Sequence, residues 1–558
     1  MRWKLVVVVG IVLLLALAAC TPQTVEVTRV VEVAGEPETV EVTRIIEVEG
    51  ETVVETEMVE VTRVVEVEGP REPTGTLIVA LPLDPNSLNP PNTAERMSEN
   101  VSNQIFDALL ALDLELNELS PALATEWEVS EDGLQYSFTL REGVTFHDGT
   151  PFNAEDVVAT FEAGADPANA YFDEYEGVTV EVIDDYHVVL VRDEPDVVFE
   201  RLLAETPIIS AEQFAEGGNQ AIEDFPIGTG PFKFVEWVKG NRIVLEANPD
   251  YWIEGLPLVA EVIFRPIPES STRLAAIQTG EVHIVNRLSS DEAQQLLGVP
   301  GVQVIRYPVD RVYYIAFNNL TTGVGLPTED PLVRQAMNYA VDREAIIDVL
   351  FDGFADLATG MITPENLGFN ASVEPFPYDP DRARELLAEA GYANGFEIGM
   401  ACPIGAYTNF EEVCQAVAGY LEEVGITLAG GEVEFMETGV YWDLQANKEL
   451  SPLFGDSWSA SEGEAYPRLF GSLGGMDASY SAWSDPAIDD YLLQISETFD
   501  REARAGLYAE LQQLMMDNPP FIYLYVPNSF EAIRDAVQGY MPNAVEAYFL
   551  KDVFLAGE

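Results

Sequence analysis

The sequence predicts an α/β protein with two lobes, an accessory domain and mixed sheets. Its 558 residues exceed what one hydrophobic core usually supports, and 47% of them are hydrophobic, which is enough for two or three domains. Alternating runs that indicate strands are interleaved with capped segments that indicate helices. The chain is expected to enter a second lobe after the strand Ile315–Phe317 and to return near Asn518–Pro520. Two such crossovers allow hinge closure of the lobes.

The N-terminus indicates export. Arg2 and Lys4 precede the apolar run Leu5–Leu17, which is too short to span a bilayer and ends in small residues. The segment Leu17-Ala18-Ala19-Cys20 resembles a bacterial lipobox, in which the cysteine is lipidated and becomes the first residue of the mature protein. A thiol buried in a core is disfavoured, because Cys20 lies between an apolar run and a polar linker. Residues 1–20 are therefore interpreted as a lipoprotein signal, and two acyl chains on Cys20 are enough for stable membrane anchoring.

Residues 21–74 repeat a short valine-rich motif. The copies are Val25–Val33, Val40–Val48 and Val59–Val67, at unequal spacing, which argues against a solenoid with one unit length. We interpret the region as a partly extended tether without ligand chemistry. Pairing of the valine-rich segments as strands, or a short coiled coil, stays open because β-branched residues favour strands.

The next elements lead to a hairpin and a capped helix. Thr76–Pro82 is expected to be a strand, and Glu99–Leu110 a helix. Asp132-Gly133 predicts a tight turn, with Trp127 and Val129 on the same face as Tyr136, Phe138 and Leu140. Asn153, followed by Asp156, then predicts the start of a helix.

The same stretch, 119–162, resembles the signature of the family 5 extracellular solute-binding proteins, the peptide and nickel class of ABC importer receptors. The matching residues are Pro121, Leu123, Ala124, Trp127, Ser130, Asp132, Gly133, Phe138, Leu140, Arg141, Gly143, Val144, Phe146 to Gly149, Pro151, Phe152, Ala154, Asp156 and Val157. Further segments are similar to the family at 226–232, 245–252, 273–284, 313–319 and 330–347. The resemblance implies a periplasmic-binding-protein-like type II fold.

The glycines of Pro226–Phe232 do not predict a phosphate site. A phosphate-binding loop needs a helix N-terminus behind it, whereas Pro231–Trp237 is expected to be a strand. Two later helices carry clear start signals. Asp330 caps and Pro331 opens the first. The same Asp-Pro pattern recurs at Asp379 and Pro380 for the second, which ends at Gly391.

The predicted organisation has five parts. After the signal 1–20 and the tether 21–74, lobe I consists of 75–102, 225–317 and 519–558. The accessory subdomain is 103–224, and lobe II is 318–518. These names are kept below.

Two segments supply the candidate ligand-binding residues. The resemblance places a ligand-lining segment at Ala94, Glu95 and Arg96, and an arginine can pair with a ligand carboxylate in a bidentate way, although a solvated loop arginine is the alternative. It also implies that a tryptophan, here Trp458, is followed three positions later by an aspartate that holds a peptide's α-ammonium. Ser461 stands at that position, and Glu462 or Glu464 is the possible substitute. Ser459 is the last of the candidate ligand-binding residues. The alternative interpretation of Trp458 is an ordinary core tryptophan.

Composition and motifs argue against several other functions. With 96 acidic and 28 basic residues, the net charge of −68 argues against nucleic acid and anionic lipid as partners. No metal-binding spacing connects His147, His187 and His283, and no cofactor is expected. Gly455–Ser459 lacks the second glycine of a nucleophile elbow, so catalytic residues are not expected. Cys402 and Cys414 are compatible with a disulfide or with two free thiols.

The sequence therefore predicts a monomeric, membrane-anchored solute receptor at the outer face of the cytoplasmic membrane. It would hold a small solute, an oligopeptide or similar, between two lobes and deliver it to ABC permease and ATPase subunits. A secreted hydrolase of oligomeric substrates and a receptor coupled to signalling are the alternatives. The identity of the solute stays open.

Overall fold

A computed structural model of the chain describes residues 25–26, 39–48, 51–60, 72–92, 95–113, 117–169, 172–459, 463–476, 478 and 480–557. It divides into two compact units, 1–69 and 70–558. In the first unit the described residues form a three-stranded antiparallel sheet of β1 (Val25–Glu26), β2 (Thr39–Val48) and β3 (Glu51–Glu60). The second repeat copy, Val40–Val48, is therefore a strand, and it pairs with β3, which lies mainly between the second and third copies.

The second unit contains a twelve-stranded mixed sheet that runs through both lobes. Its lobe I strands are β4 (Thr76–Leu81), β11 (Phe232–Val238), β12 (Arg242–Ala247), β13 (Glu261–Pro266), β14 (Ile284–Leu288) and β15 (Val302–Pro308). The strands in lobe II are β16 (Arg311–Phe317), β17 (Ala355–Leu357), β19 (Met400–Ile404), β21 (Glu434–Glu437) and β22 (Leu453–Ser459). The mixed α/β architecture is confirmed.

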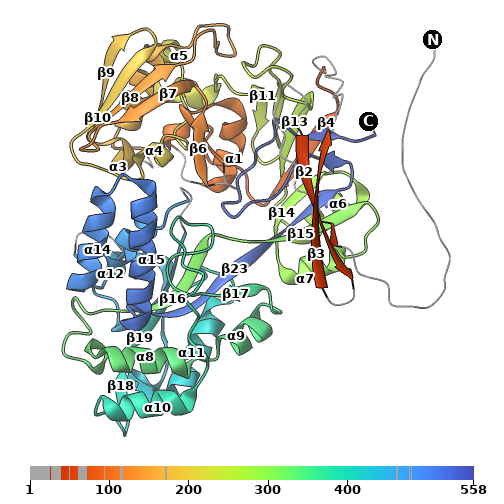
Figure 1. Ribbon diagram of the computed structural model, residues 1–558. Coiled ribbons are helices and arrows are strands. Elements are labelled where there is room, and N and C mark those ends of the chain that lie inside the picture. The colour runs from red at the N-terminus through yellow and green to blue at the C-terminus, as the bar shows by residue number, and fades with distance from the viewer. Residues whose placement is uncertain are drawn as a thin grey trace, which may run out of the picture. The chain divides into compact units, whose positions relative to one another are not determined.

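Strand β23 (Phe521–Arg534) joins the two halves of this sheet (Figure 1). Up to Pro527 it pairs with β16 and β17, and from Asn528 onward it pairs with β15 and β14. By its pairing with β22, β16 lies in the lobe II part of the sheet, although the sequence analysis counted residues up to 317 with lobe I. The passage between lobes therefore runs between β15 and β16, and the return runs along β23.

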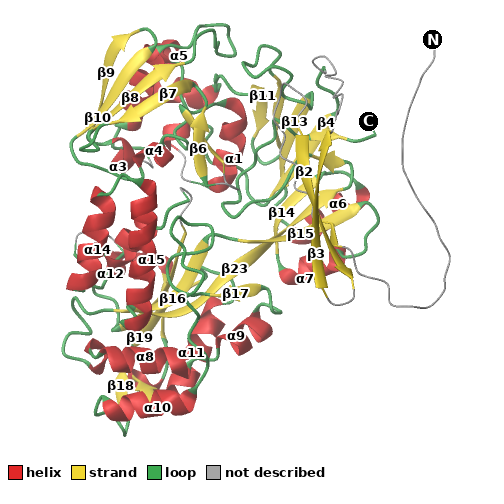
Figure 2. Cartoon of the chain, in the orientation of Figure 1, coloured by secondary structure: helices red, strands yellow, loops and turns green. Residues whose placement is uncertain are grey.

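Helices pack against the large sheet in both lobes (Figure 2). Lobe I has α1 (Arg96–Ile105), α6 (Ser270–Thr279) and α7 (Ser290–Leu296). Lobe II has α8 (Pro331–Ala340), α9 (Arg343–Leu350), α10 (Pro380–Glu389), α11 (Phe410–Glu423), α12 (Thr438–Ala446), α13 (Tyr466–Leu473), α14 (Pro486–Glu497) and α15 (Arg501–Asp517), with a small pair β18 (Phe396–Ile398) and β20 (Ile426–Leu428). The start signals at Asp330 and Asp379 are confirmed, since each carboxylate accepts a backbone N–H of the helix it caps.

The accessory subdomain has its own sheet and core. β7 (Ala124–Val129), β8 (Gln135–Leu140), β10 (His187–Arg192) and β9 (Val178–Asp184) pair in this order. The predicted hairpin is confirmed, because Trp127 pairs with Phe138 and Val129 with Tyr136. Around it lie α2 (Ala154–Gly164), α3 (Phe172–Tyr175), α4 (Phe199–Leu202), α5 (Ala211–Asp224) and the pair β5 (Leu110–Asp113) and β6 (Glu118–Pro121). Asn153 and Asp156 form the predicted capping box of α2.

Three features of the structure can be compared with the sequence predictions: the bounds of α1, the glycines of 226–232 and the cysteine pair. The helix expected at Glu99–Leu110 instead spans Arg96–Ile105, so both predicted ends were wrong. The glycines of 226–232 serve packing, because a Cβ on Gly228 or Gly230 would collide with the Ile105 carbonyl at the end of α1. Cys402 and Cys414 form a buried disulfide between β19 and α11. In the parts of the chain that are described, no helix is long and apolar enough to cross a membrane.

Candidate solute-binding site

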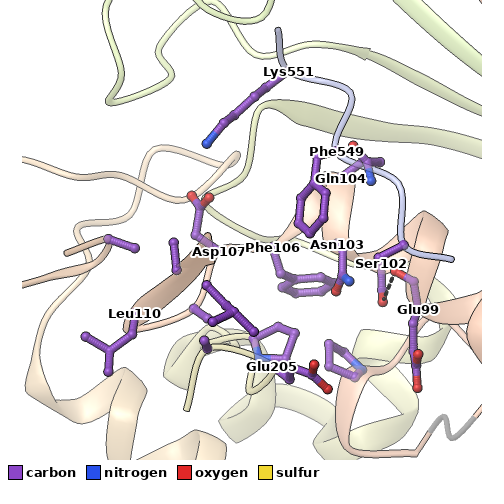
Figure 3. Close-up of a pocket in the computed structure, with 18 of the residues that line it drawn as sticks. Glu99, Ser102, Asn103, Gln104, Phe106, Asp107, Leu110, Glu205, Phe549 and Lys551 are labelled. Carbon is purple, nitrogen blue, oxygen red and sulfur yellow. Dashed lines mark hydrogen bonds between the residues drawn. The ribbon is translucent and has the colours of Figure 1, made fainter. Parts of the chain in front are cut away.

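A pocket of about 450 Å³ lies where lobe I, the accessory subdomain and the C-terminal segment meet (Figure 3). Its walls come from α1, from β5 and β6, from the loop after α4, from the loop after β12 and from the C-terminal segment 545–551. The charged residues among its lining are Arg96, Glu99, Asp107, Glu205 and Lys551. Aromatic lining comes from Phe106, Tyr175, Tyr251, Trp252 and Phe549.

Helix α1 presents its polar side chains to this pocket because of its spacing. Arg96, Glu99 and Asn103 recur every three or four residues, so they share one face. Met97, Val101 and Ile105 lie on the opposite face and are fully buried in the core of lobe I. Arg96 Nη1 and Glu99 Oε2 form an ion pair at 2.8 Å. The amphipathic helix therefore fixes both charges at the pocket wall.

Asp107 fixes the wall that carries the aromatic side chains. Its carboxylate accepts hydrogen bonds from Trp252 Nε1 at 2.8 Å, Thr229 Oγ1 at 3.0 Å and Tyr251 Oη at 3.1 Å. Burial raises the pKa of Asp107 above its ordinary value, while these hydrogen bonds and the charge of Lys551 oppose the rise. In Figure 3 the Lys551 side chain extends toward Asp107, whereas Glu99 and Glu205 lie away from Lys551.

Lobe II contacts two segments that border the pocket. The backbone N–H of Asp310, which begins the passage into lobe II, donates to Ala544 O at 3.0 Å, and the next residue, Val545, lines the pocket. On the accessory side, Asn117 Nδ2 donates to Gly463 O at 2.7 Å and to Glu365 O at 3.3 Å. Asn117 immediately precedes β6, whose Ser120 and Pro121 also line the pocket. The lining itself includes no residue of 318–518.

The structure gives different positions to the residues of the first predicted site segment, 94–96. Arg96 lies in the pocket lining, as a ligand-contacting residue requires. Both carboxylate oxygens of Glu95 are occupied, because Oε1 accepts Met97 N–H at 2.9 Å and Oε2 accepts Ser98 N–H at 3.0 Å. Glu95 is thus the N-cap of α1. Ala94 lies outside the described residues.

Trp458 and Ser459 stand at the end of β22, outside the pocket lining. The Trp458 ring meets Tyr480 edge to face, with centroids 4.8 Å apart, and packs against Gly471 of α13. It is half-buried, whereas Ser459 is exposed and accepts a hydrogen bond from Arg311 Nη2 at 3.2 Å. Ser461 and Glu462 lie outside the described residues.

Glu464 is completely buried and its carboxylate is occupied. Arg504 donates to both oxygens, at 2.9 Å and 2.5 Å, and Tyr508 Oη donates at 3.0 Å. Arg201 of the accessory subdomain approaches the same carboxylate at 3.3 Å. A solute ammonium would have to displace these donors, so we leave Glu464 out of the site. The network instead joins the accessory subdomain to lobe II.

The histidines take part in local bonds. His147 Nε2 lies 3.0 Å from Gly230 O, His187 Nδ1 lies 2.7 Å from Asp184 Oδ1, and His283 Nδ1 accepts Ile78 N–H at 2.9 Å. Burial lowers the pKa of His147 to about 4. Among the described residues, no group of three or more His, Cys, Asp or Glu side chains is arranged to hold a metal ion.

Sequence reasoning missed Asp107 and Lys551, which line the pocket. Trp252, which donates to Asp107, lies in a segment already marked as family-like, but nothing in that pattern assigned it a contact. Lys551 is one of five lysines in a strongly acidic chain, and this scarcity was the available signal.

Two α/β lobes that share one sheet, with a polar, aromatic-lined pocket in lobe I and the accessory subdomain, are typical of a solute-binding protein. The family model for bacterial extracellular solute-binding proteins, family 5, middle region, matches residues 118–479. The glutathione-binding protein GsiB of Escherichia coli strain K12 is 31% identical over 475 residues, covering 83% of this chain and 91% of the relative. The chain belongs to the family 5 bacterial extracellular solute-binding proteins.

Solved structures agree with this assignment. HbpA2 from Haemophilus parasuis superposes with a TM-score of 0.79 at 26% identity, covering 86% of this chain and 100% of that one. The ABC transporter-associated periplasmic binding protein DppA from Helicobacter pylori, in complex with the peptide STSA, gives 0.69 at 28% identity, covering 86% and 98%. The chain is thus a periplasmic or extracellular solute-binding protein of the ABC-importer class and not an enzyme.

Proposed function

We propose that this protein captures a small peptide or a peptide-like solute, of the size of glutathione or a tetrapeptide, and delivers it to an ABC permease with its ATPase subunits. The observation that carries the proposal is the pocket of about 450 Å³ with charges of both signs on its walls. Pockets for small ligands are typically about 300–1,000 Å³ and combine apolar lining with a few placed polar groups. The ligands of two relatives, glutathione for GsiB and the peptide STSA for DppA, support this class.

The pocket chemistry suits a zwitterion. Lys551 places a cation on one side of the pocket. Glu205 and Glu99, which is ion-paired with Arg96, place carboxylates on another. A peptide-like solute carries both an ammonium and at least one carboxylate, so opposite charges at separate places favour one orientation. The aromatic lining supplies apolar area for side chains of varied shape. Arg96 and, from lobe II, Trp458 and Ser459 complete the proposed contacts.

Hinge closure is the proposed mechanism of capture. The chain passes between lobe I with its accessory subdomain and lobe II only near 308–311 and along β23. Binding energy from contacts made by both lobes would stabilise the closed form, because a ligand shifts an equilibrium only by its differential affinity. The proposed division into lobe I, accessory subdomain 103–224 and lobe II is supported by separate buried cores in lobe II and around the accessory sheet, although Ile105, Ala163 and Ile222 pack in the core of lobe I.

The proposed anchor is a lipid on Cys20, which lies outside the described residues. It would hold a monomer at the outer face of the cytoplasmic membrane, with residues 21–74 as the connection to lobe I. Mass spectrometry of the membrane fraction tests this anchor. A diacylated N-terminal Cys20 peptide is expected, and an unmodified peptide that begins at Met1 would contradict it.

Native mass spectrometry of the non-denatured protein tests the solute class. A carried mass consistent with a peptide of two to five residues, or with glutathione, is expected. Titration calorimetry of the emptied protein with glutathione and with Ser-Thr-Ser-Ala then gives the affinities. A carried solute of another class, returned unchanged and bound tightly, would contradict the peptide assignment while leaving the receptor function intact.

A further inference from the structure

Arg311 occupies the first position of β16, where the chain enters lobe II. In the sheet it pairs with Ser459, the last residue of β22. Its guanidinium donates from Nη1 to Ser457 Oγ at 2.9 Å and from Nη2 to Ser459 Oγ at 3.2 Å. The arginine is half-buried and Ser459 is exposed, so the cluster is reachable from solvent.

The partners of this guanidinium are hydroxyl groups alone. Within the described part of the chain no carboxylate forms an ion pair with Arg311, although 96 acidic residues face only 28 basic ones in the sequence. Asp456 is close in the sheet, but its oxygens accept Tyr407 Oη at 2.9 Å and Gln445 Nε2 at 2.7 Å. Burial raises the pKa of Asp456, and those hydrogen bonds together with the nearby charge of Arg311 oppose the rise, without a direct ion pair between the two side chains.

A guanidinium held in this way keeps donors for a further anion. Arginine has five N–H donors in a fixed fork that matches the two oxygens of a carboxylate. Two of these donors are used by the serines, which fix the plane of the fork without neutralising its charge. The charge therefore remains available for an anionic group of a ligand.

The residue that precedes Arg311 in the chain contacts a segment that borders the pocket. This residue, Asp310, donates its N–H to Ala544 O, and the segment from Val545 onward forms a pocket wall. Ala544 immediately precedes this wall, and from that contact we infer that the start of β16 borders the pocket on its lobe II side. A solute that extends from the lobe I pocket toward lobe II would meet this region.

We propose that Arg311, oriented by Ser457 and Ser459, binds a carboxylate of the solute and selects for solutes that carry one there. This inference rests on the proposed function, because it names a specificity residue for the same solute. Charge-assisted hydrogen bonds to a carboxylate correspond to about 10- to 100-fold in affinity. Toward this carboxylate Ser457 and Ser459 are positioning residues that act through the arginine, whatever direct contact Ser459 makes elsewhere on the solute.

The test compares wild type, Arg311→Gln and a control, Arg384→Gln, which removes an exposed lobe II arginine paired with Asp381 at 2.8 Å. Calorimetry uses glutathione and Ser-Thr-Ser-Ala, each as the free acid and with its carboxylates amidated. Wild type and the control are expected to prefer an acid over its amide by about 10- to 100-fold. Arg311→Gln is expected to lose this preference by weakening the acid and leaving the amide unchanged, a pattern that misfolding cannot produce.

The outcomes separate the two proposals. If wild type binds an acid and Arg311→Gln keeps the same preference for it over the amide, the inference fails and the proposed function stands. If wild type binds neither acid nor amide and its carried solute has no carboxylate, the peptide-like function and the inference fail together.

Discussion

Glu464 and Arg311 lie near the same segment of lobe II, but their charged groups have opposite environments. The Glu464 carboxylate is fully buried and is met by two guanidinium groups and a phenol. The Arg311 guanidinium is half-buried and is met by two serine hydroxyls. The charge of Glu464 is neutralised by buried arginines, whereas the charge of Arg311 is oriented by hydroxyl groups that do not neutralise it.

This contrast indicates where to look for binding groups in a protein so rich in carboxylates. A buried charge must be paired, because desolvation costs several kcal/mol per ion, and a paired charge has little left for a ligand. A partly exposed charge held by neutral groups keeps its attraction for an opposite charge. The acidic residues after Trp458 were the natural candidates in the sequence, whereas the arginine on the neighbouring strand is the more available group.

Replacing Glu464 should give the largest effect on stability. Glu464→Gln leaves Arg504 and Arg201 buried without their shared carboxylate, so the free energy of unfolding is expected to fall by about 3–5 kcal/mol. Urea denaturation followed by circular dichroism measures it. The control is Glu502→Gln, an exposed position on α15, where a change within about 0.5 kcal/mol is expected. A loss below about 1 kcal/mol for Glu464→Gln would show that the network contributes little to the free energy of unfolding.

Glu531 extends the comparison to a buried carboxyl group whose bonding partners are phenols. Tyr540 Oη donates to it at 2.7 Å and Tyr307 Oη at 3.2 Å, and burial raises its pKa to about 8. Between the ordinary value of 4.5 and about 8, the folded protein therefore holds a proton that the unfolded chain has released. This group's contribution to stability is fully present below 4.5 and is lost as pH rises through about 8.

The variant Glu531→Gln should remove this contribution to the pH dependence. Stability of wild type relative to Glu531→Gln is expected to decline from about pH 4.5 to about pH 8, by an amount on the order of a few kcal/mol. Chemical denaturation across this range measures the difference. Glu397→Gln, an exposed strand position, is the control and should track wild type. Parallel curves for wild type and Glu531→Gln would contradict the assignment of a proton to Glu531.

Trp458 tests whether the end of β22 faces the solute at all. Trp458→Ala is expected to weaken solute binding by a few kcal/mol at most, as truncation of an aromatic contact does. Calorimetry with the co-purified solute measures it, and Trp237→Ala, a half-buried tryptophan on lobe I strand β11, is the matched control. Unchanged affinity in Trp458→Ala would assign this ring to packing against Tyr480 and Gly471 alone.

The smallest expected effect is that of Arg311→Gln on stability. Because the arginine satisfies hydroxyls and no buried carboxylate, its loss should cost about 1 kcal/mol or less. The urea midpoint is expected to stay close to that of wild type. A loss as large as that for Glu464→Gln would remove the distinction between the two charges.

Local features of the fold could be predicted from sequence because local physics decides them. The hairpin at Asp132-Gly133 and the caps at Asn153, Asp330 and Asp379 depend on turn chemistry and on side chains within a few residues. The start of α1 was missed because its N-cap is Glu95, a residue type outside the preferred capping set.

The site could be predicted only in part, because distant segments build it. Arg96 was found through a family resemblance, but its pocket also needs the C-terminal segment with Lys551 and the Asp107 wall. Glu464 was a reasonable substitute for a missing aspartate until Arg201 and Arg504, from two other parts of the chain, met it in the fold. No spacing rule connects residues so far apart in sequence.

Strand β23 has a consequence for how the molecule deforms. Pro527 lies at the point where the strand changes its neighbours from β17 to β15, and proline brings no amide hydrogen to the ladder. Its carbonyl still accepts the N–H of Val309, from the other connection between the lobes. The two connections between the lobes therefore meet at Pro527 and Val309, and we expect torsion between the halves to concentrate there instead of spreading along the backbone.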